Sequence, residues 1–578
     1  MKVLGCLNPQ GPHSADIRGT FRRFASRTLP TNTTMGLFPK KAEEPTIMSP
    51  SEHDTEKDVT PANIENGPTP PAAAIDPEVE KRVRRKLDMN LIPLVSALYL
   101  RTSPSPLLKT LTNTSTVAFL DRSNIGNARI AGMETDLHFK EGDYDWLLTI
   151  FYISYICFGF LAIMWKVVPP HYWAAFCVFT WGLVSTVQAA AKNWGTMMAL
   201  RFIMGASEVA YGPGVPFLLS FFYLRDELGL RSGLFLSAAP LANTFAGALA
   251  YAITSGSPAL AKWRVLFLVE GLPTVVMAVV AFFFLPDSPE KARFLNEEER
   301  EVARARGVRQ AGAATRVGGI NFKEFFAGLA DPKGWILGLM YFSCNVAFSS
   351  LPVFLPTSKC FLSSDYRRGT ILIMTAVLKE MGFSSVSAQG LTAPPFFLSF
   401  LMVILTCYIA DRTQQRGLMV ASLTAIGGIG YVILAASHSV GARYFGVFLA
   451  AAGIFPAIGN ILPWVTNNQG SDTRRGAGIV ILNLIGQCGP LLGTRMYPTT
   501  EGPYYVKGQS VCAAFLFFCC FLALTLRTLY VWENKKLDQK YGTVAQQKLA
   551  MQEAAARGEG KGHEAGVENY GPLFRHVL

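Results

Sequence analysis

The stretch AFLDRSNIGNARI, residues Ala118–Ile130, places an aspartate and an arginine side by side next to apolar sequence. The apolar run before it, Leu91–Leu100 (LIPLVSALYL), is too short to cross a bilayer alone. A charged pair at membrane depth is costly, and it marks a functional site by default. Asp121 and Arg122 are therefore the first candidates for a functional site.

The composition is that of a membrane protein. Of the 578 residues, 50% are hydrophobic and only 16% are charged, whereas soluble domains have about 25% charged residues. The net charge of +12 could suggest a nucleic-acid partner. However, the basic residues lie in short clusters between apolar segments, which is typical of cytoplasmic loops. We therefore expect a lipid bilayer, and no nucleic acid, as the surrounding partner.

Eleven further apolar runs are long enough to span a membrane, and with the first run they make twelve transmembrane helices of an all-α polytopic protein. The even count and the loop charges place both termini in the cytoplasm. The runs are Tyr144–Met164, Tyr172–Ala190, Met197–Phe217, Gly233–Thr254, Val265–Leu285, Gly334–Pro356, Leu391–Ala410, Leu418–Ala436, Arg443–Val465, Ala477–Met496 and Val511–Val531.

A long central loop, residues 286–333, predicts two six-helix halves at 87–285 and 334–531. A weak internal repeat favours this division, because Arg201 to Pro213 resembles Arg443 to Pro456. Residues 1–86 and 532–578 are expected to be cytoplasmic tails, the first one disordered. Within the loop, Asn296 followed by three glutamates predicts a capped surface helix.

Two polar stretches do not fit these spans. Residues 101–117 interrupt the first helix, and residues 358–376 separate LPT from VLKEMGF. Polar backbone of this kind is not tolerated where it faces lipid. We interpret both as foreign inserts, such as translated introns; the second has the alternative of an external loop. Transcript sequencing distinguishes the two interpretations.

Several segments resemble the major facilitator superfamily, specifically the fungal allantoate permease branch of the anion:cation symporters. They include LDRSNIGNARIAGM, MALRFIMGASEVAYGPG, LPDSPEKARFLNEEER and WVTNNQGSDTRRGAGIVILNLIGQCGP. The resemblance implies the major facilitator fold. It also implies proton-coupled symport of a small organic anion, such as nicotinate, pantothenate or allantoate, by a monomer in the plasma membrane.

The loop between the second and third helices departs from the superfamily pattern, since Lys166 is its one charged residue. The equivalent loop between the eighth and ninth helices keeps IADRTQQRG, and the resemblance assigns Asp411 and Arg412 there to gating. We therefore expect a different contact to close the first half.

An anionic substrate needs a cation in a low-dielectric site, and arginine binds a carboxylate through two parallel hydrogen bonds. Arg122 is the candidate, and a purely structural pair with a carboxylate is the alternative. Asn124, Asn345 and Asn483 are weaker substrate-binding candidates, for which hydrogen bonding between helices is the alternative. Tyr152 could stack on a ring-bearing substrate, although packing is the more common role.

Proton coupling needs a carboxylate whose pKa is raised by burial. Asp121 and Glu208 are the candidates. Glu208 follows Arg201 by two helical turns, so both lie on one face, and the resemblance implies roles in coupling and gating. The alternative is a structural salt bridge at the cytoplasmic end, which is favoured for Arg201 because we place it near the membrane interface.

Other functions are less well supported by the sequence. Export of a secondary metabolite is the first alternative, and a transport-inactive sensor is the second. An enzyme is disfavoured, because the chain has no Ser/His/Asp set and no phosphate loop. The ten cysteines and seven histidines give no metal-ligand spacing, so neither a metal nor a cofactor is expected.

Overall fold

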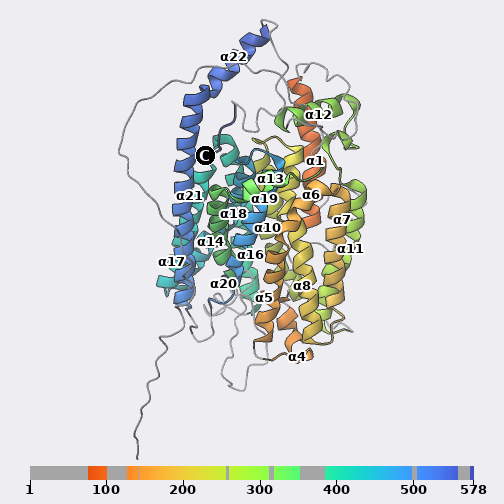
Figure 1. Cartoon of the computed structure of the whole chain (residues 1–578). Coiled ribbons are helices and arrows are strands. Elements are labelled where there is room, and N and C mark those ends of the chain that lie inside the picture. The colour runs from red at the N-terminus through yellow and green to blue at the C-terminus, as the bar shows by residue number, and fades with distance from the viewer. Residues whose placement is uncertain are drawn as a thin grey trace, which may run out of the picture. The chain divides into compact units, whose positions relative to one another are not determined.

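The computed structural model describes residues 76–100, 125–126, 128–140, 142–255, 260–311, 318–351, 385–497, 501, 504–556 and 573–578. This part of the chain is a bundle of long helices and contains no strand (Figure 1). The inserts proposed at 101–117 and 358–376 lie outside it.

The helices form two groups along the chain. The N-terminal group consists of α1 (Pro77–Leu100), η1 (Arg129–Met133), α4 (Glu134–Asp136), α5 (Asp143–Cys157), η2 (Gly159–Ile163), α6 (Met164–Val167), α7 (Pro170–Gln188), α8 (Trp194–Tyr211), α9 (Gly214–Phe222), α10 (Leu228–Ser255) and α11 (Lys262–Phe284). The C-terminal group consists of α14 (Pro332–Ser350), α16 (Ser385–Thr413), α17 (Arg416–Ala436), α18 (Val440–Asn467), α19 (Asp472–Gly486), α20 (Cys488–Gly493) and α21 (Val506–Tyr541). Between and after them lie η3 (Pro289–Lys291), α12 (Glu297–Ala311), α13 (Phe322–Leu329) and α22 (Val544–Ala556).

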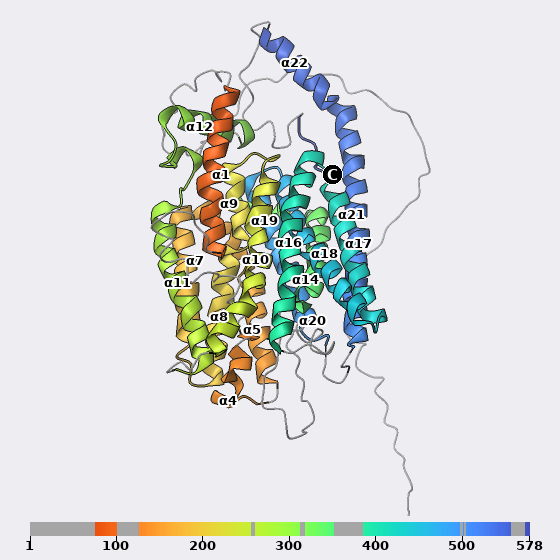
Figure 2. The same ribbon diagram turned by 180° about the vertical axis from the view of Figure 1, so that it is seen from behind.

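The two ends of the bundle differ. At one end α1 begins and α12 lies; at the opposite end lies α4 (Figures 1 and 2). We refer to these as the α12 end and the α4 end.

Among the described residues, seven helices are long and apolar enough to cross a membrane; α8 and α9 count as one of them, α19 and α20 count as another, and the one that contains α21 runs on to Gln547. The number is eight if α5 and the η2–α6 segment, bent by 47° at their junction, form one span. Each of the predicted apolar runs coincides with helix in the described part of the chain, which confirms the all-α membrane architecture.

Three predicted spans are each broken in two. The run Tyr144–Met164 changes at Phe158 from α-helix to a 3₁₀ turn. The run Met197–Phe217 breaks before Pro213, and the run Ala477–Met496 breaks at Gln487, three residues before Pro490. Proline lacks the amide hydrogen that a continuous helix needs and its ring clashes one turn back, which explains the second and third breaks.

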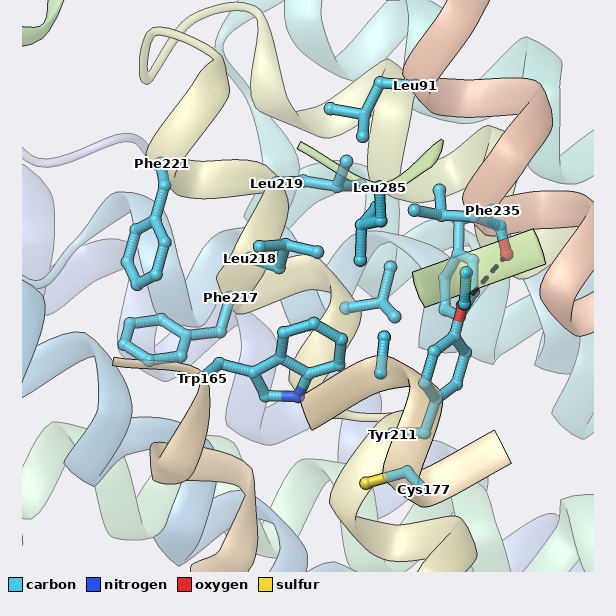
Figure 3. Packing of buried hydrophobic residues seen from close by; sticks show 14 of the residues in the cluster. Leu91, Trp165, Cys177, Tyr211, Phe217, Leu218, Leu219, Phe221, Phe235 and Leu285 are labelled. Atoms are coloured by element: carbon cyan, nitrogen blue, oxygen red, sulfur yellow. Dashed lines mark hydrogen bonds between the residues drawn. The ribbon is translucent and has the colours of Figure 1, made fainter. Parts of the chain in front are cut away.

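Each group has its own hydrophobic core. In the N-terminal group, Trp165, Tyr211, Phe217 and Phe235 are fully buried. They lie among leucines of α1 and α9 and the leucine that directly follows α11 (Figure 3). The Tyr211 hydroxyl donates to the Val95 carbonyl of α1 at 3.3 Å, so the polar tip is also satisfied. A second core lies among α14 to α21, and a third one joins η1, α5, α8 and α11 at the α4 end.

The central loop helix is confirmed, but it is not a free surface helix. Asn296 accepts from the Glu299 amide at 2.9 Å, and its own amide donates to the Glu299 carboxylate at 3.0 Å, a reciprocal capping box. Lys86 of α1 reaches the fully buried Glu299 at 2.7 Å, and Arg306 reaches Glu80 at 3.6 Å. α12 is therefore docked on α1.

The same contacts correct the expected disorder of residues 1–86, because α1 already begins at Pro77. Residues 77–86 carry charges that pair with α12, and composition alone cannot reveal that pairing. At the other terminus, α21 continues to Tyr541, ten residues beyond the predicted end of its span at Val531. Residues 573–578 then return to the bundle, at the point marked C in Figure 1.

Candidate functional site

Helix α8 carries two buried charges. The Asn193 side chain accepts from the Thr196 amide at 2.8 Å and fixes the start of the helix. Arg201 is 1% exposed and Glu208 is 4% exposed. They are seven residues apart, about two helical turns, so they lie on one face of α8. The helix thus holds a cation and a carboxyl group inside an apolar bundle.

Arg201 does not lie near the α12 end of the bundle. It follows by one turn Met197, which packs in the core at the α4 end with Leu147 and Trp263. The Trp194 indole, in the first turn of α8, donates to the Asp143 carbonyl at the start of α5 at 3.0 Å. Arg201 is therefore a buried residue in the half of α8 nearer the α4 end.

Helices α5 and α8 approach each other closely in the part of α8 between Arg201 and Glu208. A Cβ atom on Gly205 would lie 2.5 Å from the Phe151 carbonyl oxygen, so only glycine permits this approach. The Ser154 hydroxyl donates to the Phe202 carbonyl across the same contact. Tyr152 is buried at 3% exposure, with its ring edge-on to Phe151 at 5.3 Å. Tyr152 is thus a packed side chain in this structure.

Two asparagines of the C-terminal group differ in their contacts. The Asn345 amide donates to the Gly486 carbonyl at 3.1 Å and joins α14 to α19. Asn483 is fully buried, yet neither its oxygen nor its nitrogen has a hydrogen-bond partner among the described residues. Its Cβ lies 3.4 Å from the position a Cβ would take on Gly159 of the N-terminal group. Asn483 therefore lies where the two groups meet.

The groups also meet at the α12 end. The Asp411 carboxylate accepts from the Leu230 amide in the first turn of α10 at 2.5 Å, and it pairs with the buried Arg416. Arg412 is exposed and lies over the Tyr408 ring of its own helix at 5.5 Å. Asp411 thus contacts both groups, whereas Arg412 has no such contact among the described residues.

Lys166 makes the contact that replaces the missing charges of the loop between the second and third helices. Its ammonium donates to the Thr473 hydroxyl of α19 at 3.0 Å. Close by, a Cβ on Gly476 would lie 2.9 Å from Ile163, so the backbones pack tightly. The expectation of a different contact in the first half agrees with this arrangement.

At the α4 end the groups meet through Arg495, which the sequence left unassigned. Its guanidinium donates to the Thr149 hydroxyl of α5 at 3.3 Å and lies 5.8 Å from the Trp146 ring centre. Asn483 lies ten residues after Thr473 and twelve before Arg495 on the same chain segment. Along the chain, the buried amide therefore lies about midway between two contacts that join the helix groups.

Comparison with known proteins identifies the family. The family profile described as Major Facilitator Superfamily matches residues 111–494. The chain belongs to this superfamily. It is 31% identical, over 83% of its length and 93% of the relative, to the MFS transporter prlL of Fungal sp. (strain NRRL 50135). It is 28% identical, over 79% of each chain, to the high-affinity nicotinic acid transporter of Saccharomyces cerevisiae.

A solved structure shows the same fold. The superfamily's proton:xylose symporter XylE, bound to 6-bromo-6-deoxy-D-glucose, superposes with a TM-score of 0.55 at 12% identity, over 78% of this chain and 95% of that one. The relatives and the fold are those of multi-pass membrane transporters and not of enzymes. For a major facilitator protein, a polar site between two helix groups is where a small substrate is carried.

The remaining predicted residues cannot be placed. Asp121, Arg122 and Asn124 lie outside the described residues, so their roles stay predictions. Sequence reasoning also missed the contacts of Lys166 and Arg495. Each is a single cation in apolar surroundings, and that was the available signal. Their partners are two threonine hydroxyls and a tryptophan ring, which no charge pattern marks.

Proposed function

We propose that this transporter carries a small organic anion together with protons by alternating access. The observation that carries the proposal is the burial of Arg201 and Glu208 on one face of α8. Charged groups inside membrane bundles are expensive and are retained where they serve transport. In this proposal Glu208 loads and releases the proton, because it is a carboxyl group held inside the bundle on the same face as Arg201.

The class of substrate that we propose follows from the positively charged arginine side chains. Arginine stays charged when it is buried, so Arg122, with Asp121 beside it, is the proposed partner of a substrate carboxylate. Asn483 supplies a neutral amide that has no hydrogen-bond partner among the described residues and can bind the polar part of the substrate. The relative in Saccharomyces cerevisiae is a nicotinic acid transporter, which supports a carboxylate substrate. We infer no single substrate within this class.

The contacts at the two ends serve as gates in this proposal. Asp411 and Lys166 close the α12 end, and Arg495 closes the α4 end. The loop charges favour a cytoplasmic α12 end and cytoplasmic termini in the plasma membrane. Downhill proton flow from outside would then drive uptake by a monomer.

An uptake assay with two carboxylate variants tests the proposal. Radiolabelled nicotinate, pantothenate and other carboxylates are offered to transport-deficient yeast at acidic and neutral pH. Glu208→Gln should abolish the stimulation of uptake by acidic pH and spare counterflow exchange, since the neutral amide mimics the protonated acid.

The matched control is Glu270→Gln, because Glu270 of α11 is the same residue type at 1% exposure in the same helix group. Its pH dependence should match that of the unmodified transporter. If Glu270→Gln uncouples transport while Glu208→Gln does not, the assignment of Glu208 is wrong. If no carboxylate is accumulated at either pH, the anion proposal itself fails.

A further inference from the structure

The last five residues of the chain, Phe574–Leu578, are packed into the transporter. Phe574 is 3% exposed, Val577 is 8% exposed and His576 is 9% exposed. A free polar tail would expose all three side chains. The end of the chain lies beside α21, as both whole-chain views show (Figures 1 and 2). This segment therefore occupies a specific binding site on the bundle.

Leu578 is held at a helix N-terminus. Its carbonyl oxygen accepts from the Gly417 amide at 3.0 Å, and Gly417 is the second residue of α17. The first turn of a helix has amides without a partner in the helix, and the Leu578 oxygen supplies an acceptor for one of them. The Val577 carbonyl accepts from the Trp464 indole at 2.8 Å and from the Asn468 amide at 3.1 Å.

The preceding residues are bound through their backbone and side chains. Asn534 of α21 accepts from the His576 amide at 2.7 Å and donates to the His576 carbonyl at 2.9 Å. The His576 ring stacks on Tyr530, with centres 4.6 Å apart and planes 15° apart. Arg575 pairs with Asp538 at 2.7 Å. These contacts fix the register of the segment along α21.

One asparagine joins the segment to the other helix group. The Asn468 oxygen accepts from the Val577 amide at 2.8 Å and from the Arg225 guanidinium at 3.3 Å. Arg225 lies between α9 and α10, in the N-terminal group, and its guanidinium also lies over the Phe574 ring at 4.4 Å. The segment thus touches both groups at the α12 end.

We propose that residues 574–578 are a C-terminal latch that holds the α12 end closed and leaves its site before that end opens. Parting of the two groups separates Arg225 from Phe574 and from Asn468 at the same time. The latch adds to the Asp411 and Lys166 contacts, which remain when it is absent. It acts in the absence of substrate, so it does not depend on which molecule is carried.

Spin-label distances test the latch in the full-length transporter. Asp226→Cys and Thr413→Cys place labels on exposed positions of the two groups at the α12 end, in a background without other reactive cysteines. One variant is truncated after Leu573. A second keeps every native residue and adds Gly-Gly after Leu578, next to the contact with Gly417. Gly-Gly at the N-terminus is the matched control.

The truncated and extended variants should gain a population with a longer label distance, which the control lacks. An acetylated peptide of residues 571–578 should reverse this in the truncated variant. If truncation and extension leave the distances unchanged, the latch does not exist.

Discussion

At the scale of single residues, variants of Asn483 and Asn345 distinguish a residue that binds substrate from one that stabilises the fold. Asn483→Ala removes no hydrogen bond to a described residue, so stability should change little while uptake of the carried carboxylate falls at least tenfold. Asn345→Ala removes the bond to Gly486, and the free energy of unfolding should fall by about 1–2 kcal/mol. Thermal unfolding in detergent and uptake kinetics check both variants. Normal uptake by Asn483→Ala would exclude Asn483 from substrate binding.

The two asparagines also show what a sequence can predict about a site. Both are lone amides in apolar helices, so residue type and spacing treat them alike. They differ in their neighbours. The Gly486 carbonyl lies within hydrogen-bond distance of the Asn345 amide, whereas the Asn483 side chain has no hydrogen-bond partner among the described residues. In contrast, the shared helix face of Arg201 and Glu208 was predictable, since their spacing is set by helix geometry within one segment.

At the scale of helices, the contact between α5 and α8 depends on Gly205. Gly205→Ala should lower the free energy of unfolding by about 1–3 kcal/mol, because its methyl group meets backbone that cannot move aside. Gly195→Ala, on the same helix, is the control: its methyl group would meet nothing closer than 3.7 Å, and alanine favours helix. Thermal unfolding of both purified variants is the measurement. Equal stability of the two would show that α5 and α8 have room to move apart.

Capping residues and prolines predicted where helices begin and break, but not which helices pack against each other. The capped start of α12 was predictable because Asn296 and Glu299 act within one turn. Its docking on α1 was not, since Lys86 lies over two hundred residues away in the chain. The breaks at Pro213 and Pro490 had a visible cause in the sequence, whereas the break at Phe158 has no proline beside it.

At the scale of the whole molecule, the α12 end is closed by contacts of different kinds. Asp411 contributes a carboxylate, Lys166 contributes an ammonium group, and the proposed C-terminal latch contributes backbone hydrogen bonds and a buried aromatic ring. The fold was predictable from the apolar runs, because the bilayer permits few alternatives. The latch was not, because the sequence FRHVL is short and has no periodic pattern; its site exists only where α17, α18 and α21 converge.

The latch should also respond to pH through His576. Burial, together with the nearby charges of Lys333 and Arg225, lowers the pKa of docked His576 to about 3. Its Nε2 donates to Glu533 at 3.1 Å, and its ring contacts Tyr530 and Phe574. The buried Nδ1 has no partner among the described residues, so a proton there would be unsatisfied.

An undocked histidine has a pKa near 6.5. Because docking lowers the pKa, docking is fully stable above about pH 6.5 and weakens as the pH falls towards the docked value. Binding of the acetylated 571–578 peptide to the truncated transporter should therefore weaken about eightfold between pH 7 and pH 5.5. Fluorescence anisotropy of a labelled peptide measures this. A peptide with His576→Gln keeps a neutral donor and should lose most of the pH dependence; an equal slope for both peptides would assign the effect to another group.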